Sequence, residues 1–166
     1  YFSSDRPGGF GGMDLYFVEI LKDNQLGKPI NLGPDINSSL DEVFPFSFSE
    51  NILFYSSNNK ETEELNIKMA KHLIEERWET FNLKSPFNSN QDDFSFSLDK
   101  NLKIGLFTSK REEGKGDDDL YAFKFTPKII GEDDKYIYNP SDTLAVSFNG
   151  ILKNDKELMK NRDPLT

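Results

Sequence analysis

The sequence predicts an all-β chain: a partial β-propeller of about two and a half four-stranded blades, followed by the start of a small β-sandwich. Aromatic residues make up 13% of the chain while hydrophobic residues reach only 36%, a balance that favours short strands over long helices. Related motifs recur with a period near 50 residues, as in propeller blades. Within the copies, aromatic residues alternate with small polar ones, as in half-buried strands.

Composition narrows the classes of partner. The 166 residues carry a net charge of -9, from 29 acidic and 20 basic side chains. Nucleic acid and anionic membrane surfaces would repel such a chain, so we expect neither as a partner. There is no cysteine, which excludes disulfides and thiolate metal sites. No apolar run reaches the roughly 18 to 20 residues of a membrane span, so no transmembrane segment is predicted, and an export signal or anchor would lie outside these residues.

The clearest internal match joins two polar stretches. "NLGPDINSSLDE" at residues 31–42 aligns without a gap to "NLKSPFNSNQDD" at residues 82–93, 51 positions later. Because both stretches are rich in turn-forming residues, we expect them to be crossovers from one blade to the next. The matched crossover residues are Asn37 and Asn88, and Asp41 and Asp92.

Short strand motifs recur at a similar spacing. "FSS" at residues 2–4 recurs as "YSS" at 55–57 and as "FTS" at 107–109. "DLY" at residues 14–16 recurs at 119–121, whereas the middle copy holds "NIK" at 66–68 and is the divergent one. The chain therefore begins, in repeat terms, at the second strand of a blade.

One copy is predicted to hold four strands. They cover residues 44–49, 52–57, a segment that starts near Asn66, and residues 77–83. The stretch "NIKMAKHLIEERW" at residues 66–78 also has helical spacing and good helix-forming residues, so a helix is the alternative there. The repeat favours strand, turn and strand.

The glycine-rich loop "DRPGGFGGM" is predicted to be a turn. A phosphate-binding glycine loop must lead into a helix, but this one leads into "DLYFVEI", which alternates like a strand. Its counterpart, "KREEGKGDD", is acidic and would repel phosphate. No cofactor is predicted.

The aspartate that follows each glycine loop is predicted to be a structural tether. Asp14 would accept hydrogen bonds from loop amides and from Ser3 or Ser4, and Asp119 from its loop and Ser109. General acid–base catalysis is the alternative, but recurrence in two copies favours architecture. If the tether holds, Asp119→Ala should cost about 1 to 3 kcal/mol.

No catalytic residue and no metal site are predicted. The single histidine, His72, lies in the divergent copy, and no serine has the context of a nucleophile elbow. The acidic run "GKGDDD" lacks the spaced ligands of a calcium loop and is predicted to be a solvated turn.

Residues 1–17, 29–46 and 87–123 resemble the TolB-type propeller repeats of OmpA-family envelope proteins of Bacteroidota, a group that includes a component of type IX secretion. The resemblance covers residues 1–126, predicted as propeller blades. It implies a linker at residues 127–142 and, at 143–166, the start of a carboxypeptidase-regulatory-like β-domain. The peptidoglycan-binding OmpA-like domain of that family has no counterpart here, so peptidoglycan would be reached only through a domain absent from this chain.

The resemblance implies a function without catalysis. We expect a scaffold or protein-interaction module in a periplasmic, outer-membrane-associated complex, such as type IX secretion or another peptidoglycan-linked assembly, with other cell-envelope proteins as partners. The alternatives are a propeller that supports a glycan-active or peptidase enzyme, and a carbohydrate-binding module that uses exposed aromatic residues.

The third copy is predicted to be incomplete. Its strands are "DFSFSL", "IGLFTS" and "DLYAFKF", and no fourth strand follows in the repeat pattern. An unpaired strand edge invites association. We therefore expect the edge at residues 120–125 to be paired by a strand that precedes Tyr1 or by another chain.

Overall fold

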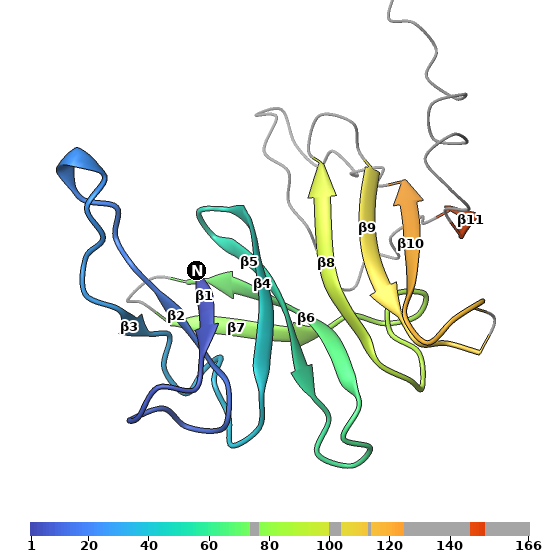
Figure 1. The fold of residues 1–166 in the computed structure, drawn as a ribbon, viewed down its shortest axis with the longest axis horizontal. Coiled ribbons are helices and arrows are strands. Elements are labelled where there is room, and N and C mark those ends of the chain that lie inside the picture. Colours follow the sequence, from blue (N-terminus) through green and yellow to red (C-terminus); the bar gives the residue numbers. More distant parts are fainter. Residues whose placement is uncertain (74–76, 100–103, 113, 125–146, 152–166) are drawn as a thin grey trace, which may run out of the picture.

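The computed structural model describes residues 1–73, 77–99, 104–112, 114–124 and 147–151. These residues form three antiparallel sheets, so the prediction of an all-β chain is confirmed (Figure 1). The sheets follow one another along the chain, and none is closed. Crossovers join them: the first crossover is residues 32–41 and the second is residues 83–92.

Each sheet contains strands that are consecutive in the sequence. The first sheet holds β1 (Phe2–Ser4), β2 (Asp14–Phe17) and β3 (Ile30–Asn31). The middle sheet holds β4 (Glu42–Ser49), β5 (Ile52–Asn58), β6 (Leu65–His72) and β7 (Trp78–Asn82). The third sheet holds β8 (Asp93–Asp99), β9 (Ile104–Ser109), β10 (Asp119–Lys124) and β11 (Ser147–Ile151).

The middle sheet shows which of the two structures predicted for residues 66–78 is formed. β6 and β7 pair antiparallel, with Lys71 opposite Glu79 and His72 opposite Trp78, so the predicted strands are confirmed and the helical alternative is wrong. The helix-like spacing has a physical reason. This sheet is covered on both faces, and β6 therefore buries Met69 on one face and Ala70 on the other.

The core consists of two layers. One cluster lies between the first and middle sheets and includes Leu15, Ile36, Leu53, Tyr55 and Ala70. The larger cluster lies between the middle and third sheets. It contains Phe54, Ile67, Met69, Leu83, Phe87, Phe96, Leu98, Phe107, Tyr121 and Phe123. Many of these residues are aromatic, and ring pairs such as Phe54 and Phe96, whose centroids are 4.3 Å apart, fill the space between the sheets.

The first strands of the middle and third sheets share a bulge. The β4–β5 pairing shifts between Val43 and Phe46, and the β8–β9 pairing shifts between Phe94 and Ser97. Phe44 and Ser95, 51 positions apart, have φ angles of 53° and 54°. The alternation of aromatic residues predicted through β4 is therefore interrupted, because the bulge turns Phe44 outward while Phe46 and Phe48 pack against the core.

The open edge of β10 is paired within the chain. β11 runs antiparallel to β10, with Lys124 opposite Ser147 and Phe123 opposite Phe148. This corrects the expectation that a strand before Tyr1 or another chain would pair this edge. A strand was expected within residues 143–166, but as the start of a separate β-domain and not as a partner of β10. Residues 127–142, predicted as a linker, and most of 143–166 lie outside the described residues.

A long hairpin projects from the first sheet. Between β2 and β3 the chain runs out and back, with the short 3-10 helix η1 (Lys22–Asn24) at its tip (Figure 1). Backbone hydrogen bonds hold its two arms together: the Gly27 amide donates to the Glu19 carbonyl at 2.8 Å, and the Leu21 amide donates to the Gln25 carbonyl at 2.7 Å.

Candidate functional site: polar contacts at the sheet crossovers

The crossover asparagines bind the next-to-last strand of the sheet that they leave, β2 or β6, in the same way in both copies. The Asn37 side chain accepts from the Leu15 amide at 2.8 Å and donates to the Leu15 carbonyl at 2.9 Å. The Asn88 side chain does the same with Ile67, at 2.8 and 2.9 Å. Each asparagine thus satisfies a backbone amide and shares the carbonyl of the same residue with a backbone amide, that of Leu32 or Leu83.

The crossover aspartates bind the backbone two residues earlier in the chain. Asp41 accepts from the Met13 amide at 2.7 Å, and Asp92 accepts from the Leu65 amide at 2.8 Å. Asp92 also forms an ion pair with Lys110 at 3.0 Å. The structure therefore brings the four predicted crossover residues into two equivalent sets, each of which joins a crossover to β2 or β6.

Asp92 also lies beside Glu64, and the two carboxyl groups influence one another. Burial alone would raise the pKa of Asp92, but hydrogen bonds from the Leu65 amide and Lys110 lower it below its ordinary value. The hydrogen bond to Asp92, followed by partial desolvation, raises the pKa of Glu64. The hydrogen bond between these two carboxyl groups contributes to both shifts, since it raises the pKa of Glu64 and lowers that of Asp92.

A second pair of carboxylates was missed in the sequence. Glu42 and Asp93 begin β4 and β8 and are fully buried. Glu42 accepts from the Ser38 amide and hydroxyl, at 2.9 and 2.7 Å, and from the Ser57 hydroxyl at 3.0 Å. Asp93 accepts from the Ser89 amide and hydroxyl. Glu42 and Asp93 are 51 positions apart and directly follow Asp41 and Asp92, so the same alignment of the two crossovers could have predicted that they are equivalent.

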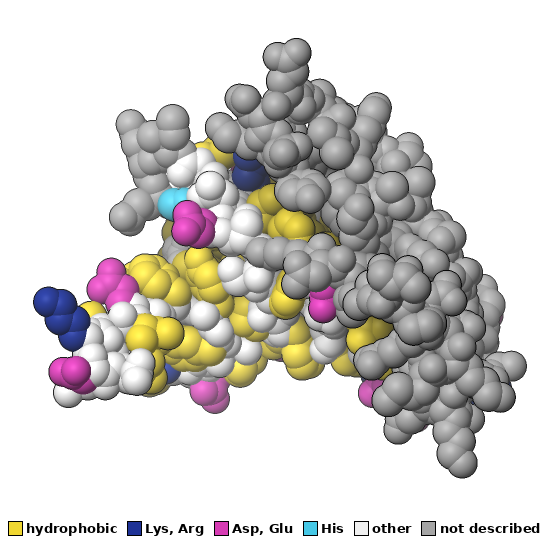
Figure 2. Space-filling model, turned by 90° about the horizontal axis from the view of Figure 1, so that it is seen from above, with side chains coloured by type: hydrophobic (Ala, Val, Ile, Leu, Met, Phe, Trp, Pro, Cys, Tyr) yellow, Lys and Arg dark blue, Asp and Glu magenta, His cyan; other side chains and the backbone are white. Residues whose placement is uncertain are grey.

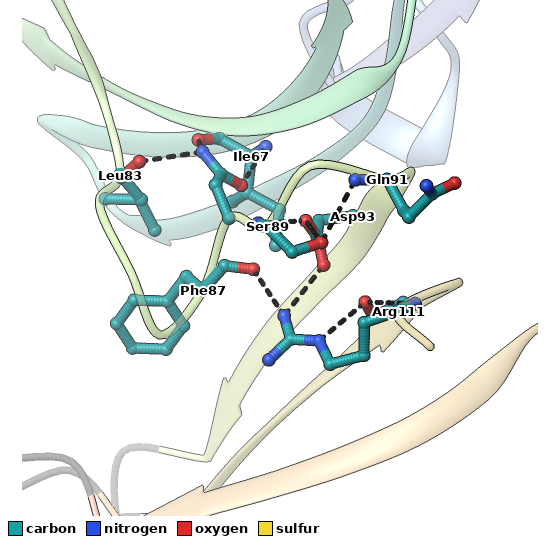
Figure 3. A network of polar contacts seen from close by, with 9 residues as sticks. Ile67, Leu83, Phe87, Ser89, Gln91, Asp93 and Arg111 are labelled. Carbon is teal, nitrogen blue, oxygen red and sulfur yellow. Dashed lines mark hydrogen bonds and ion pairs between the residues drawn. The ribbon is translucent and has the colours of Figure 1, made fainter. Parts of the chain in front are cut away.

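Arg111 completes the Asp93 cluster, as Figure 3 shows. Its Nη2 atom donates to the Asp93 carboxylate at 2.8 Å and to the Phe87 carbonyl at 3.1 Å, while its Nε donates to the Ser109 hydroxyl at 2.8 Å. The guanidinium lies over the rings of Phe107 and Tyr121, at 5.1 and 4.8 Å from their centroids. Charge, hydrogen bonds and ring contacts thus converge on one side chain.

The middle sheet has no arginine at the position equivalent to Arg111. Asn59 stands at the position of Arg111, and Lys68 stands where the other copies have tyrosine. Lys68 Nζ lies 3.4 Å from the Ser57 hydroxyl that Glu42 also binds. Burial lowers the pKa of Lys68, and the nearby Glu42 carboxylate partly offsets that shift. Burial, with the Glu42 charge, raises the pKa of Tyr55.

The predicted tethers accept loop amides but not serine hydroxyls. Asp14 accepts from the amides of Phe10 and Gly11, at 2.7 and 3.1 Å, and from the Asn31 side chain at 2.7 Å. Asp119 accepts from the amides of Lys115 and Gly116, at 2.6 and 3.1 Å. Both contacts match the expected role of these carboxylates as acceptors for their loops.

The serine partners are a correction. The hydroxyl oxygens of Ser4 and Ser109 accept hydrogen bonds from Arg6 and Arg111, two positions later in the chain. Ser3 lies opposite Leu15 in the β1–β2 ladder, and the described hydrogen bonds include none from it to Asp14. These bonds from the arginine side chains are charge-assisted.

The glycines let the loop approach its partners. A side chain at Gly11 would collide with the Leu40 carbonyl of the first crossover, and one at Gly114 would collide with the Asp119 carboxylate. The Gly12 amide donates to the Leu40 carbonyl at 3.3 Å. As predicted, the loop leads into a strand, β2, and not into a helix.

Three remaining features are the single histidine, the possibility of a metal site and that of a membrane-spanning helix. The His72 ring packs against Trp78, with centroids 4.6 Å apart. Among the described residues, no three or more histidine or acidic side chains gather as a metal site would require. Over the same parts of the chain, the model has no helix of sufficient length and apolar character to cross a membrane.

Comparisons of the chain with models of protein families, with curated proteins and with solved structures give no match. The class of protein is therefore defined by its own structure: an all-β chain of successive antiparallel sheets, joined by crossovers whose side chains bind the preceding sheet.

Proposed function

We propose that the three sheets are successive blades of a β-propeller, and that the chain is a non-catalytic scaffold for protein recognition in a periplasmic, outer-membrane-associated complex. The repeated sheets, the equivalent crossovers and the aromatic layers between the sheets support the propeller. The envelope location, including type IX secretion or another peptidoglycan-linked assembly, rests on the resemblance of the repeats.

The projecting hairpin between β2 and β3 carries the proposal of protein recognition. It presents large apolar side chains to solvent: the exposed fractions are 74% for Ile20, 68% for Leu26, 46% for Leu21 and 47% for Ile30. Ile20 and Leu26 face each other across the two arms as a bridge pair. Burying exposed apolar side chains of this kind is a main source of binding energy in protein interfaces, and a hairpin held by backbone bonds loses little entropy on binding.

The experiment is crosslinking of the full-length protein in its native envelope, followed by affinity purification and mass spectrometry. The matched variant carries Ile20→Ser and Leu26→Ser, and the control carries Lys28→Ser on the same hairpin. We expect envelope assembly components to crosslink to the wild type and to the control but not to the double variant. Equal crosslinking by all three, or recovery of a free monomer with hydrolase activity, contradicts the proposal.

A carbohydrate-binding role is the second candidate, and one observation favours it. Phe44 and Phe94, from β4 and β8, stack with ring centroids 5.3 Å apart, and Phe44 is 45% exposed. Figure 2 shows that hydrophobic side chains occupy much of the visible face of the described part of the molecule. Exposed aromatic rings are able to stack on sugar rings. A glycan array with Phe44→Ala as the comparison tests this candidate: binding that the variant loses supports it, and no binding by the wild type contradicts it.

A further inference from the structure

The β5–β6 loop, residues 59–64, is fastened to the second crossover where it ends. The Leu65 amide, which follows the loop, donates to the Asp92 carboxylate at 2.8 Å. Asp92 also binds the start of the loop after β9. Its carboxylate pairs with Lys110 Nζ at 3.0 Å, and its carbonyl accepts from the Lys110 amide at 2.9 Å. One aspartate of the crossover therefore joins the middle sheet to the third sheet.

The first copy has the same joint with one residue changed. Met13 is the counterpart of Leu65, since its amide donates to the crossover carboxylate of Asp41 at 2.7 Å. The residue before Met13 is Gly12, and a side chain there would collide with the Asp41 carboxylate. The middle copy has Glu64 at the position of Gly12, so that a second carboxyl group lies against the crossover aspartate.

The β5–β6 loop reaches Glu64 through a left-handed residue. Glu63 has a φ angle of 62°, which residues other than glycine rarely adopt. Its amide donates to the Asn59 carbonyl at 2.9 Å, and its carbonyl accepts from the Asn58 side chain at 2.7 Å. The Asn59 amide donates to the Glu64 carbonyl at 2.8 Å. The loop backbone is thus ordered by its own bonds, and the charge of Glu64 acts mainly on the contact with Asp92.

The charged surroundings of the two carboxyl groups are simple. Among the described residues, the charged group that acts on both is Lys110, from the loop after β9. Asp117 and Asp118 of that loop act in turn on Lys110. The other charged side chains of the β5–β6 loop, at residues 60, 61 and 63, are exposed to solvent. The contact therefore depends mainly on the protons of the two carboxyl groups themselves.

The contact between Glu64 and Asp92 requires one proton. A protonated Glu64 donates a hydrogen bond to the ionised Asp92, whereas two ionised carboxylates repel each other. This bond raises the pKa of Glu64 above 4.5, and although burial acts to raise the pKa of Asp92, its hydrogen bonds lower it below 3.8. The stabilisation from both groups is therefore present between these two pKa values, and the part from Glu64 is lost as pH rises through its pKa.

We propose that Glu64, Asp92 and Lys110 form a pH-dependent latch between the β5–β6 loop and the second crossover. The latch is closed while Glu64 keeps its proton, because Glu64 then donates to the carboxylate that also holds the Leu65 amide. It loosens as Glu64 ionises, because the two negative charges repel each other and Lys110 offsets them only in part. The latch acts on the joint between the middle and third sheets, whatever partner the chain binds.

The test is amide hydrogen exchange of the whole chain between about pH 4.5 and about pH 7.5, with each rate corrected for the intrinsic effect of pH. We expect the protection of the Leu65 amide to fall by about three- to fivefold across this range, as for the loss of one exposed charged contact. The Met13 amide is the internal control, because it binds Asp41 with Gly12 and not a carboxyl group beside it. Its protection should stay constant.

Three variants separate the latch from a general effect of pH. Glu64→Gln and Asp92→Asn each remove one of the two charges, so in both the protection of Leu65 should no longer fall as pH rises. Glu61→Gln removes an exposed acid from the same loop, is the matched control, and should behave like the wild type. The proposal is overturned if Leu65 protection in the wild type does not change, if Met13 protection falls equally, or if Glu64→Gln retains the full fall.

Discussion

The middle and third sheets each bury a carboxylate at the equivalent position, Glu42 and Asp93, but different donors bind the two groups. Asp93 has an ion pair with Arg111, whose guanidinium is also fixed by two rings and a backbone carbonyl. Glu42 has two serine hydroxyls and an amide, with Lys68 behind one of those serines. The position and burial of the acid are retained while its donors change. The acid therefore belongs to the repeat, and its partner can vary from sheet to sheet.

The largest effect is expected from removing Asp93. Asp93→Ala leaves the Arg111 side chain, which is only 15% exposed, without its counterion, and this should lower the free energy of unfolding by about 3 to 5 kcal/mol. Glu42→Ala leaves mainly neutral donors unpaired and should cost about 1 to 3 kcal/mol. Urea denaturation measures both, with the exposed Asp5→Ala as control. Equal losses for Asp93→Ala and Glu42→Ala would show that the arginine does not distinguish the two sheets.

A smaller difference is expected between the two loop aspartates. Asp14 is 1% exposed and binds three donors, whereas Asp119 is partly exposed and its loop amides face solvent. Asp14→Ala should therefore cost about 1 to 3 kcal/mol, and Asp119→Ala less than about 1 kcal/mol, because water replaces the lost acceptor. This revises the loss expected for Asp119 from the sequence. The two denaturation midpoints test it, and a larger loss for Asp119→Ala would contradict it.

The smallest effect concerns pH. The pKa of Asp92 is lowered below its ordinary 3.8, so its contribution to stability is present above that pH and is lost as pH falls. The pKa of Glu64 is raised above its ordinary 4.5, so its contribution is present below that pH and is lost as pH rises. Glu64→Gln should abolish the second loss and retain the first. Thermal unfolding between about pH 3 and pH 7 measures this, and an unchanged decline above pH 4.5 in the variant would contradict it.

Much of the strand pattern was predictable because it depends on local alternation and on the repeat. β4 to β10 lie where aromatic residues alternate with small ones or where a motif recurs. The pairing of β11 with β10 was not predictable, since it depends on a contact distant in sequence, and residues 143–166 were expected to begin a separate β-domain. The bulges at Phe44 and Ser95 were also missed, because a positive φ at a phenylalanine follows from tertiary packing and not from local preference.

The candidate site was predicted in part. The crossover residues Asn37 and Asp41 were found by matching copies, although matching could not tell which backbone groups they bind. The serines were assigned to the aspartates because they end the preceding strand and each aspartate begins the next one. Arg6 and Arg111 were overlooked, since only folding brings their guanidinium groups over the rings of the next strand.

The central claim is that each crossover asparagine holds the strand of the sheet that it leaves. Amide hydrogen exchange of Asn37→Ala and Asn88→Ala tests it most directly, since Asn37 accepts from the Leu15 amide and Asn88 from the Ile67 amide. The account predicts that Asn37→Ala lowers protection at Leu15 by about tenfold or more and spares Ile67, and that Asn88→Ala does the reverse. Unchanged protection at Leu15 and Ile67 in the two variants would contradict the claim.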